Sequence, residues 1–196
     1  MLRASPVTSW NSVERTPLVC PGSYVDETAV LIGQVIVRSG VIVCPLVVLR
    51  ADEGFPIEIG EGSNIQDGVV MHCLLKSEIQ IGRNCSVAHG AIIHGPSTVG
   101  DGSFIGFRAT LLGTTLEAGC FVGHGAQILD VNIPEERYVP PGRVISTQVE
   151  ANRLPPVTSA HKEFVNKVLR VNAELLLGYL NQSVGGIILG EELLEA

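Results

Sequence analysis

The sequence predicts an all-β fold, a parallel β-helix of six-residue repeats, followed by one α-helix. Aliphatic residues recur every sixth position from Val25 to Ile128, and a short period sustained over many repeats is typical of stacked strands joined by corners. The composition agrees, because 22 Gly, 11 Pro and many Val and Ile favour strands broken by frequent turns. A β-sandwich would instead show alternation of period two between turns spaced about eight to twelve residues apart.

The repeat divides the chain into segments. Residues 1–22 show no periodicity and are expected to form an irregular lead-in, and residues 23–133 form the β-helix. The six-residue spacing slips by four residues within 55–58 and again within 73–80, and it loses one residue after Leu111. The repeated aliphatic position is occupied by Val25, Leu31, Val37, Val43, Leu49, Ile59, Ile65, Met71, Ile81, Val87, Ile93, Val99, Ile105, Leu111, Leu116, Val122 and Ile128.

A different pattern follows the repeats. Residues 134–157 are rich in proline and are expected to form a connection, and residues 158–182 carry apolar side chains at helical spacing. Thr158 or Ser159 can cap the start of this helix, which we expect to pack along one face of the stack. Residues 183–196 follow as a tail.

Charge and composition exclude several classes of partner. The formal net charge is −7 and basic residues do not cluster, so neither nucleic acid nor an anionic membrane surface is an expected partner. The longest strongly apolar run, from Val41 to Leu49, is too short to span a bilayer. The N-terminus lacks the apolar core of a signal peptide. Five scattered cysteines favour reduced, mostly buried thiols in a cytoplasmic protein.

Spacing places two histidines in one column. A four-residue insertion makes the coil between His72 and His94 twenty-two residues long, so both occupy the same position on adjacent coils. Arg50 precedes His72 by the same distance and extends this column. Neighbouring strands are about 4.8 Å apart, so the two imidazoles can reach one metal ion.

His89 belongs to a different face of the same coil, with Asp67 in the equivalent position one coil below it. It cannot readily reach a metal held by His72 and His94 of its own chain. In a threefold trimer of prisms, however, its face meets the face of His72 and His94 on a neighbour. The sequence therefore predicts a homotrimer with metal sites between subunits, an arrangement compatible with closed symmetry.

Three imidazoles with an open fourth position are typical of a catalytic zinc site. Any one of these histidines alone would more often be an interface residue with satisfied hydrogen bonds, so the combined spacing carries the prediction. Cys73 follows His72 and should point to the opposite face if this segment is a strand, which favours a place in the core over a role as fourth ligand. We expect structural roles for His124 and His161. Zn2+ is the expected ion, with Fe2+ or Co2+ as alternatives.

These residues lie in motifs that resemble the γ-class carbonic anhydrases. The motifs are LRADEG (49–54), NIQDGVVMH (64–72) and VAHGAIIHGP (87–96), and the resemblance covers roughly residues 20–180. It implies a left-handed β-helix, a homotrimer, CO2 and bicarbonate as ligands, and His72, His89 and His94 as zinc ligands.

Further motifs are similar to the anhydrase-like N-terminal domain of the carboxysome assembly protein. They are FIGFRAT (104–110), YVPPGRVISTQ (138–148) and LLLGY (175–179). This likeness implies carboxysome-type components as partners and a place in the cytoplasm or within a carboxysome-like body.

The resemblance also implies roles around the metal. Arg50 and Asp52 would form an ion pair across the interface, and Glu53 would help to move protons. Gln66 would hydrogen-bond the metal-bound water, and Asn172 would contact CO2 or bicarbonate. Asp67 would support His89 or the interface. A purely structural network remains the alternative for Arg50, Asp52 and Asp67.

One departure from the family bears on activity. The enzymes carry a long acidic loop after the first histidine ligand, whereas this chain has only CLLKSEIQ (73–80), with Glu78 as its sole acid. Reversible CO2 hydration is the leading hypothesis, and a bicarbonate-binding or scaffold component with little activity is the second. The third is acyl transfer, because many β-helices of this repeat use acetyl-CoA with one general-base histidine and no metal.

Overall fold

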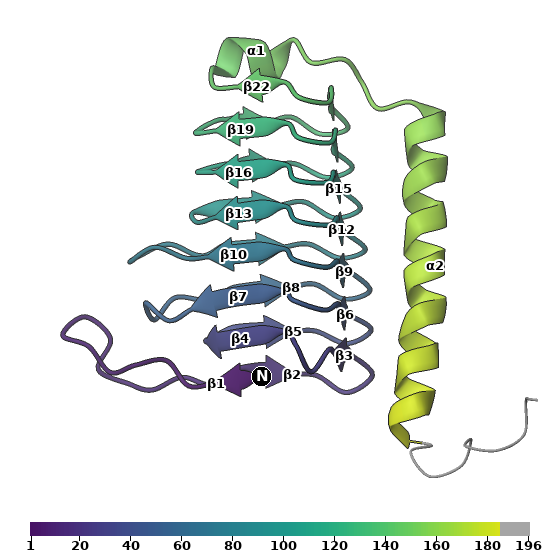
Figure 1. Ribbon diagram of the computed structural model, residues 1–196. Coiled ribbons are helices and arrows are strands. Elements are labelled where there is room, and N and C mark those ends of the chain that lie inside the picture. Colours follow the sequence, from purple (N-terminus) through teal and green to yellow (C-terminus); the bar gives the residue numbers. More distant parts are fainter. Residues whose placement is uncertain (185–196) are drawn as a thin grey trace, which may run out of the picture.

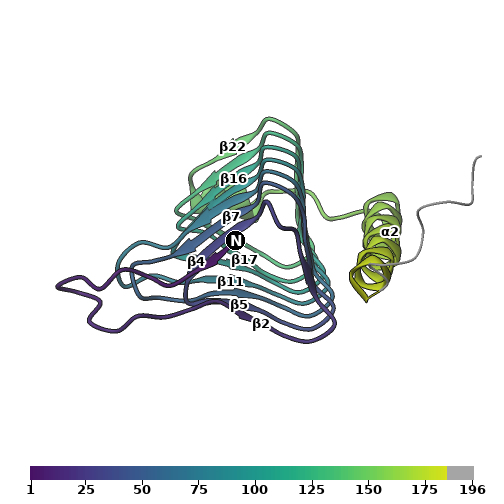
Figure 2. The same cartoon turned by 60° about the horizontal axis from the view of Figure 1, so that its bottom comes forward.

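The computed structural model describes residues 1–184, which form a stack of coils flanked by one long helix (Figure 1). Each full coil contributes one short strand to each of three parallel sheets, so the stack is a triangular prism when viewed toward its end (Figure 2). The predicted parallel β-helix of hexapeptide repeats is therefore confirmed.

The three sheets are numbered in the order in which the chain first visits them. Sheet 1 consists of β1 (Leu2–Arg3), β4 (Val30–Gly33), β7 (Val48–Ala51), β10 (Val70–His72), β13 (Ile92–His94), β16 (Thr110–Leu112), β19 (Gln127–Leu129) and β22 (Val144–Ile145). Sheet 2 consists of β2 (Leu18–Val19), β5 (Val35–Val37), β8 (Ile57–Ile59), β11 (Ile79–Ile81), β14 (Ser97–Val99), β17 (Thr115–Leu116) and β20 (Asn132–Ile133). Sheet 3 consists of β3 (Tyr24–Val25), β6 (Ile42–Val43), β9 (Asn64–Ile65), β12 (Ser86–Val87), β15 (Phe104–Ile105), β18 (Phe121–Val122) and β21 (Tyr138–Val139).

The core fills the inside of the prism. The repeated aliphatic residues stack directly above one another, as in the pairs Leu49–Met71 and Met71–Ile93 on sheet 1. Both Leu49 and Ile93 are fully buried, and so are most members of this series. Burial of such side chains stabilises the fold by about 1.5–3 kcal/mol each.

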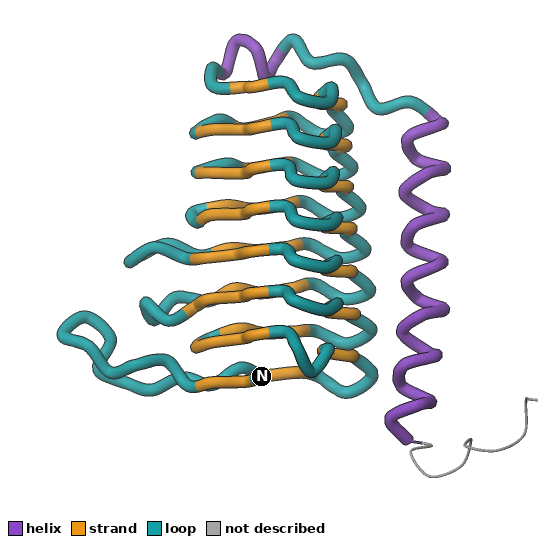
Figure 3. The backbone as a smooth tube through the Cα atoms, viewed as in Figure 1, coloured by secondary structure: helices purple, strands orange, loops and turns teal. Residues whose placement is uncertain are grey.

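Every change in repeat length falls at one corner, the corner between sheets 1 and 2. Ten residues separate Leu49 from Ile59 there, and five separate Leu111 from Leu116. Longer connections project from this corner in the lower coils (Figure 3), and they include residues 4–17 between β1 and β2. The other two corners keep the six-residue spacing, so sheet 3 and sheet 1 stay in register throughout.

The β-helix extends beyond its predicted bounds at both ends. The predicted lead-in, residues 1–22, contains β1 and β2, which pair with β4 and β5 to make a lowest coil. The predicted connection, residues 134–157, contains β21, β22 and the short helix α1 (Gln148–Asn152). A second one-residue deletion, between Ile128 and Ile133, displaced the six-residue spacing and hid these strands from the sequence pattern.

Helix α2 (Ser159–Val184) runs alongside sheet 3 and contacts β3, β6 and β12 (Figure 1). Thr158, one of the two residues expected to cap the helix, precedes its first residue, and Thr158 Oγ1 accepts a hydrogen bond of 3.4 Å from His161 N. Part of the predicted tail, residues 185–196, lies outside the described residues. No helix in residues 1–184 is long and apolar enough to cross a membrane.

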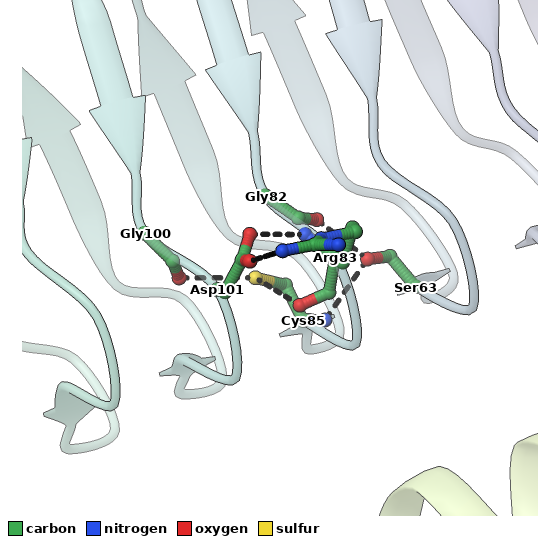
Figure 4. A network of polar contacts seen from close by, with 6 residues as sticks. All are labelled: Ser63, Gly82, Arg83, Cys85, Gly100 and Asp101. Atoms are coloured by element: carbon green, nitrogen blue, oxygen red, sulfur yellow. Dashed lines mark hydrogen bonds and ion pairs between the residues drawn. The ribbon is translucent and has the colours of Figure 1, made fainter.

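Polar side chains tie neighbouring coils together at the corner between sheets 2 and 3. Arg83 donates two hydrogen bonds to Asp101 Oδ2, of 3.0 and 2.7 Å, and its backbone N donates to Asp101 Oδ1 (Figure 4). Below them, Ser63 Oγ accepts from Cys85 N at 2.9 Å. This corner is a structural seam, on the opposite edge of sheet 3 from the corner that carries His89.

Candidate metal centre

The column predicted from spacing is present on sheet 1. Arg50 on β7 pairs with His72 on β10, and His72 pairs with His94 on β13. The two imidazole rings have centroids 5.2 Å apart at an interplanar angle of 80°. Imidazoles that share a tetrahedral Zn2+ through nitrogens about 2.0 Å from the ion have centroids about 5 Å apart, so this spacing suits a shared ion.

Two carboxylates face the Nε2 atom of His72. Asp52 Oδ1 and Glu53 Oε1 each lie 3.6 Å from it, beyond hydrogen-bonding distance. His72 Nε2 and Asp52 Oδ1 are both buried without a hydrogen-bond partner in the described part of the chain. Burial, and then the nearby Arg50, lower the pKa of His72, which favours the neutral imidazole that a metal requires.

Arg50 holds Asp52 within one chain. Its Nη2 and Nε atoms donate to Asp52 Oδ2 over 3.1 and 3.2 Å. We expect this ion pair across a subunit interface, and within the single chain Arg50 and Asp52 also pair with each other. The reason is local, because Asp52 directly follows β7 and turns back toward the outer face of the strand that carries Arg50.

The ring of His94 is oriented by the backbone carbonyl of the next residue. Its Nδ1 lies 3.1 Å from the carbonyl of Gly95, and this nitrogen must donate because a carbonyl oxygen only accepts. The lone pair of Nε2 is then free to bind a metal ion.

His89 lies at the corner between sheets 3 and 1, in the turn after β12, rather than on the flat face of sheet 3 as predicted. Its Nδ1 is 2.8 Å from Asp67 Oδ2, and Asp67 occupies the turn one coil below. The predicted support of His89 by Asp67 is thus seen within one chain. The side chain of His89 is 54% exposed, so Nε2 is accessible from outside.

One chain alone does not assemble the three histidines. His89 lies in the turn before β13 and His94 is the last residue of β13, so the two lie on opposite sides of that strand. Two nitrogens on one Zn2+ can be no more than about 4 Å apart. Consistent with this, residues 1–184 contain no group of three His, Cys, Asp or Glu side chains that could hold a metal ion.

Gln66 follows β9, close to the corner of His89, and is 7% exposed. Its Nε2 donates to Asn64 Oδ1 over 3.0 Å, and Asn64 Nδ2 donates to Ser86 Oγ over 2.8 Å. This chain of bonds leaves Gln66 Oε1 as an available acceptor. Sequence reasoning missed Asn64 and Ser86, although their twenty-two-residue separation was a signal that they stack.

Asn172 lies on α2 and not beside His72. Its Nδ2 donates to the carbonyl of Val168 over 2.9 Å, and the residue lines a cavity of about 280 Å³ between α2 and sheet 3, together with Asn64. The predicted site residues therefore form two groups on one chain. Arg50, Asp52, Glu53, His72 and His94 lie on sheet 1 and its corner with sheet 2, whereas Gln66, Asp67, His89 and Asn172 lie on sheet 3, α2 and the corner beside His89.

Neighbouring residues behave as expected. Cys73 is buried in the core, as expected, and burial raises the pKa of its thiol to about 12. Glu78, the acid of the short loop, accepts from Gln80 Nε2 over 2.9 Å and so lies on the side of sheet 2. His161, in the first turn of α2, stacks on Phe121 of β18, with ring centroids 4.6 Å apart.

The donor set fits a divalent metal ion such as Zn2+. His89 and His94 each commit Nδ1 to an oxygen acceptor, and His72 buries an unpartnered Nε2. Such oxygen partners on metal-binding imidazoles are the usual second shell of zinc sites. The residues present therefore match the ion that the spacing suggested.

Comparisons with known proteins agree with this reading. The chain is 36% identical over 203 residues to the carbonic anhydrase of Methanosarcina thermophila, which covers 93% of this chain and 82% of that protein. The chain belongs to the γ-class carbonic anhydrase family. A family model described as bacterial transferase hexapeptide (six repeats) also matches residues 78–113 of this anhydrase-family chain.

One similar protein is much longer than this chain. The carboxysome assembly protein CcmM of Nostoc is 40% identical over 187 residues, which covers 90% of this chain and 34% of that protein. The chain thus spans about a third of the length of that relative. Among solved structures, a hexapeptide transferase family protein from Anaplasma phagocytophilum has a TM-score of 0.56 and 24% identity, over 84% of this chain and 93% of that one. That likeness shows the fold alone.

Proposed function

We propose that this protein catalyses the reversible hydration of CO2 to bicarbonate, with Zn2+ bound between subunits of a homotrimer. Fe2+ or Co2+ are alternative ions for the same donors. The observation that carries the proposal is the division of the histidines: His72 and His94 converge on one face, while His89 is oriented outward at another corner.

The surface of sheet 1 supports an interface at this site. Val70, Ile92 and Leu112 point outward from it and are 37%, 47% and 37% exposed. Helix α2 covers sheet 3, whereas nothing in residues 1–184 covers this apolar face. Contiguous exposed apolar side chains of this kind commonly mark a protein interface. A second copy that places its His89 corner here would cover the apolar face and complete the metal site.

Each group of residues then has a role in the reaction. Bound Zn2+ would lower the pKa of a coordinated water to about 7 and so supply the nucleophile for CO2. Gln66 Oε1 would accept a hydrogen bond from that water and orient it. Glu53, 3.6 Å from His72 Nε2, would take up the proton and release it to solvent. Arg50 would hold Asp52 and contact bicarbonate, and Asn172 of the second copy would approach the substrate.

A mixed-trimer experiment tests the shared site. Subunits with His89→Ala keep an intact His72–His94 pair, and subunits with His94→Ala keep an intact His89. Trimers assembled from equal amounts of the two should recover about a quarter of the sites, because each interface needs one subunit of each kind in the correct order. Zinc content and stopped-flow CO2 hydration would measure the recovery.

The matched control mixes His72→Ala with His94→Ala. These residues act from the same chain, so no mixed interface would contain both, and neither zinc nor activity should return. Equal recovery in both mixtures would show that the three histidines do not divide between subunits as proposed. Full zinc occupancy of the unmodified trimer, with no hydration above the buffer rate, would exclude the catalytic function.

A bicarbonate-binding or scaffold component is the second candidate, and the loop after β10 favours it. Leu74 and Leu75 are exposed there, and Glu78 is turned toward sheet 2, so the loop presents no carboxylate toward His72. In this case a carboxysome-like assembly would supply the partners, and His94→Ala would leave partner binding unchanged in a pull-down. If this variant lost partner binding together with the metal, the result would favour the enzyme over the scaffold.

A further inference from the structure

The segment between β1 and β2 reaches the loop that carries Asp52 and Glu53. Between these two connections lies the turn from β4 to β5, which has a single linking residue, Gln34. This turn is tight because Gly33 has φ +79° and a Cβ there would overlap the carbonyl of Ala51. The short turn leaves room for residues 4–17 to pass it and contact the loop two coils above their own.

Residues 5–15 are tied into a compact loop by their own hydrogen bonds. Asn11 is its centre: its Nδ2 donates to Ser5 Oγ at 3.2 Å and to the carbonyl of Pro6 at 3.3 Å. Ser5 Oγ also accepts from Arg15 N at 3.0 Å. Thr8 N donates to the carbonyl of Asn11 at 2.8 Å. Asn11 and Ser5 are 6% and 1% exposed, so this polar network is buried despite its place in an irregular segment.

The contact between the two loops is made by Asn11 and Gly54. A Cβ on Gly54 would lie 2.9 Å from Asn11 Oδ1 and 3.0 Å from its Cγ, closer than side chains pack. Gly54 also has φ +92°, a conformation that other residues rarely adopt. A cavity of about 250 Å³ lies between the loops, lined by residues that include Trp10, Asn11 and Glu53.

We propose that the loop of residues 5–15 is a clamp that positions the Asp52–Glu53 turn against His72, with Asn11 seated on Gly54 as its contact. Asp52 and Glu53 lie between β7 and β8 and outside any strand, and on the side of β7 Arg50 holds Asp52 through two hydrogen bonds. The clamp fixes the far side of this turn, and the carboxylates on its near side lie 3.6 Å from His72 Nε2. Asn11 is thus a positioning residue. This inference rests on the proposed function only in its effect on turnover.

The test uses the full-length trimer with Asn11→Ala, Ser5→Ala and Gly54→Ala. Trp10 is the only tryptophan and lines the cavity, so its quenching by acrylamide reports loop docking without any metal. Each variant should raise the quenching constant of Trp10, by up to about twofold, because the loop opens locally. The 15N shift of His72 in histidine-labelled, metal-free protein should change as the carboxylates move. The kcat for CO2 hydration per bound zinc should fall about fivefold, with little change in KM.

Gly22→Ala is the matched control. Gly22 has φ +77° and no atom near its missing Cβ, so this variant carries the same backbone strain without an inter-loop contact. It should leave all three measurements at the level of the unmodified protein. Ser5→Ala and Asn11→Ala leave the backbone at residue 54 unchanged, so they serve if Gly54→Ala does not fold.

The outcomes separate the clamp from the proposed function. Unchanged Trp10 quenching in Asn11→Ala would overturn the clamp. Trp10 quenching in a variant could rise while its His72 shift and its kcat stay equal to those of the unmodified protein. The loop would then dock in the unmodified protein but position nothing, which also overturns the clamp. An unmodified trimer without hydration activity would defeat the proposed function alone, since Trp10 and His72 would still decide whether the clamp exists.

Discussion

The geometry of the site depends on which nitrogen of each imidazole is free. Asp67 and the carbonyl of Gly95 accept from Nδ1 of His89 and His94, so both rings present Nε2 outward. A metal ligand without such a partner can change tautomer or rotate, which lowers affinity. The oxygen acceptors are therefore as much a part of the centre as the histidines.

Substitution of Asp67 tests this requirement. Asp67→Asn should weaken zinc binding about 10–100-fold, because the neutral amide holds the ring of His89 less firmly. Competition with a chromophoric chelator would measure the affinity. Asp101→Asn breaks a comparable exposed pair with Arg83 at another corner and should leave the affinity unchanged. Equal affinities for all three proteins would contradict the role of Asp67.

Residue spacing could predict the His72–His94 pair because a parallel β-helix converts equal coil length into vertical stacking. The orientation of Asp52 could not be predicted in the same way. It depends on the conformation of the turn after β7, in which Gly54 has φ +92° and leaves no room for a Cβ beside Asn11. Asn64 escaped notice because its role appears only in its bonds to Gln66 and Ser86.

At the scale of elements, helix α2 is held to sheet 3 by an aromatic cluster. Phe104 is 1% exposed and stacks on Phe121, with ring centroids 4.7 Å apart. Phe164 of α2 contacts the Phe104 ring edge-on, with ring centroids 5.3 Å apart. Aromatic pairs add about 0.5–1.5 kcal/mol each to the free energy of burial.

Removal of the central ring should loosen α2. Phe104→Ala is expected to lower the free energy of unfolding by about 3–5 kcal/mol, because it leaves a cavity beneath the helix. Urea denaturation followed by far-UV circular dichroism would measure the change. Leu177→Ala, at a position on α2 that is 62% exposed, should shift the midpoint little. Similar midpoints for the two variants would show that the cluster does not anchor the helix.

The sequence revealed the interior elements more fully than the terminal ones. Between Val25 and Ile128, the predicted aliphatic positions are the ones that stack. The outermost coils were missed because residues 4–17 interrupt the first coil and a deletion precedes Ile133. Proline was also a misleading signal, since Pro140 and Pro141 lie at a corner, where a missing N–H does not break the strand pairing.

For the whole molecule, thiols removed from solvent make the free energy of unfolding depend on pH in the alkaline range. Burial raises the pKa of Cys44, Cys73 and Cys85 to about 12 and that of Cys120 to about 11, whereas an unfolded thiol titrates near about 8.5. Between these values the unfolded chain has lost protons that the folded chain retains. The free energy of unfolding should therefore hold below pH of about 8.5 and fall as the pH rises above it.

Urea midpoints measured from pH 7 to pH 10.5 would show this fall. Cys73→Ala removes one of the thiols, so its midpoint should decline less steeply with pH even if the variant is less stable at neutral pH. Parallel slopes for the two proteins would contradict the linkage. These four thiols should react slowly with a thiol reagent in the folded protein for the same reason, because the thiolate is the reactive form.

Assembly is the remaining property at this scale. Ile92→Glu places a charge on the outer face of sheet 1, where we propose that a second copy binds. The expected result is a monomer near 20.8 kDa instead of a trimer of three times that mass, with loss of bound zinc. Light scattering after gel filtration would measure the mass. Thr98→Glu, on the outer face of sheet 2, should remain trimeric, and a trimeric Ile92→Glu protein would move the interface elsewhere.

The corner between sheets 1 and 2 contains every insertion and deletion, while the other corners keep the six-residue spacing. Segments inserted at this corner would therefore leave the strand register of the rest of the prism unchanged. The connections at this corner can be lengthened, recharged or reshaped while His72 and His94 keep the positions that the coils give them. The connections at this corner can thereby change independently of the β-helix that supports them.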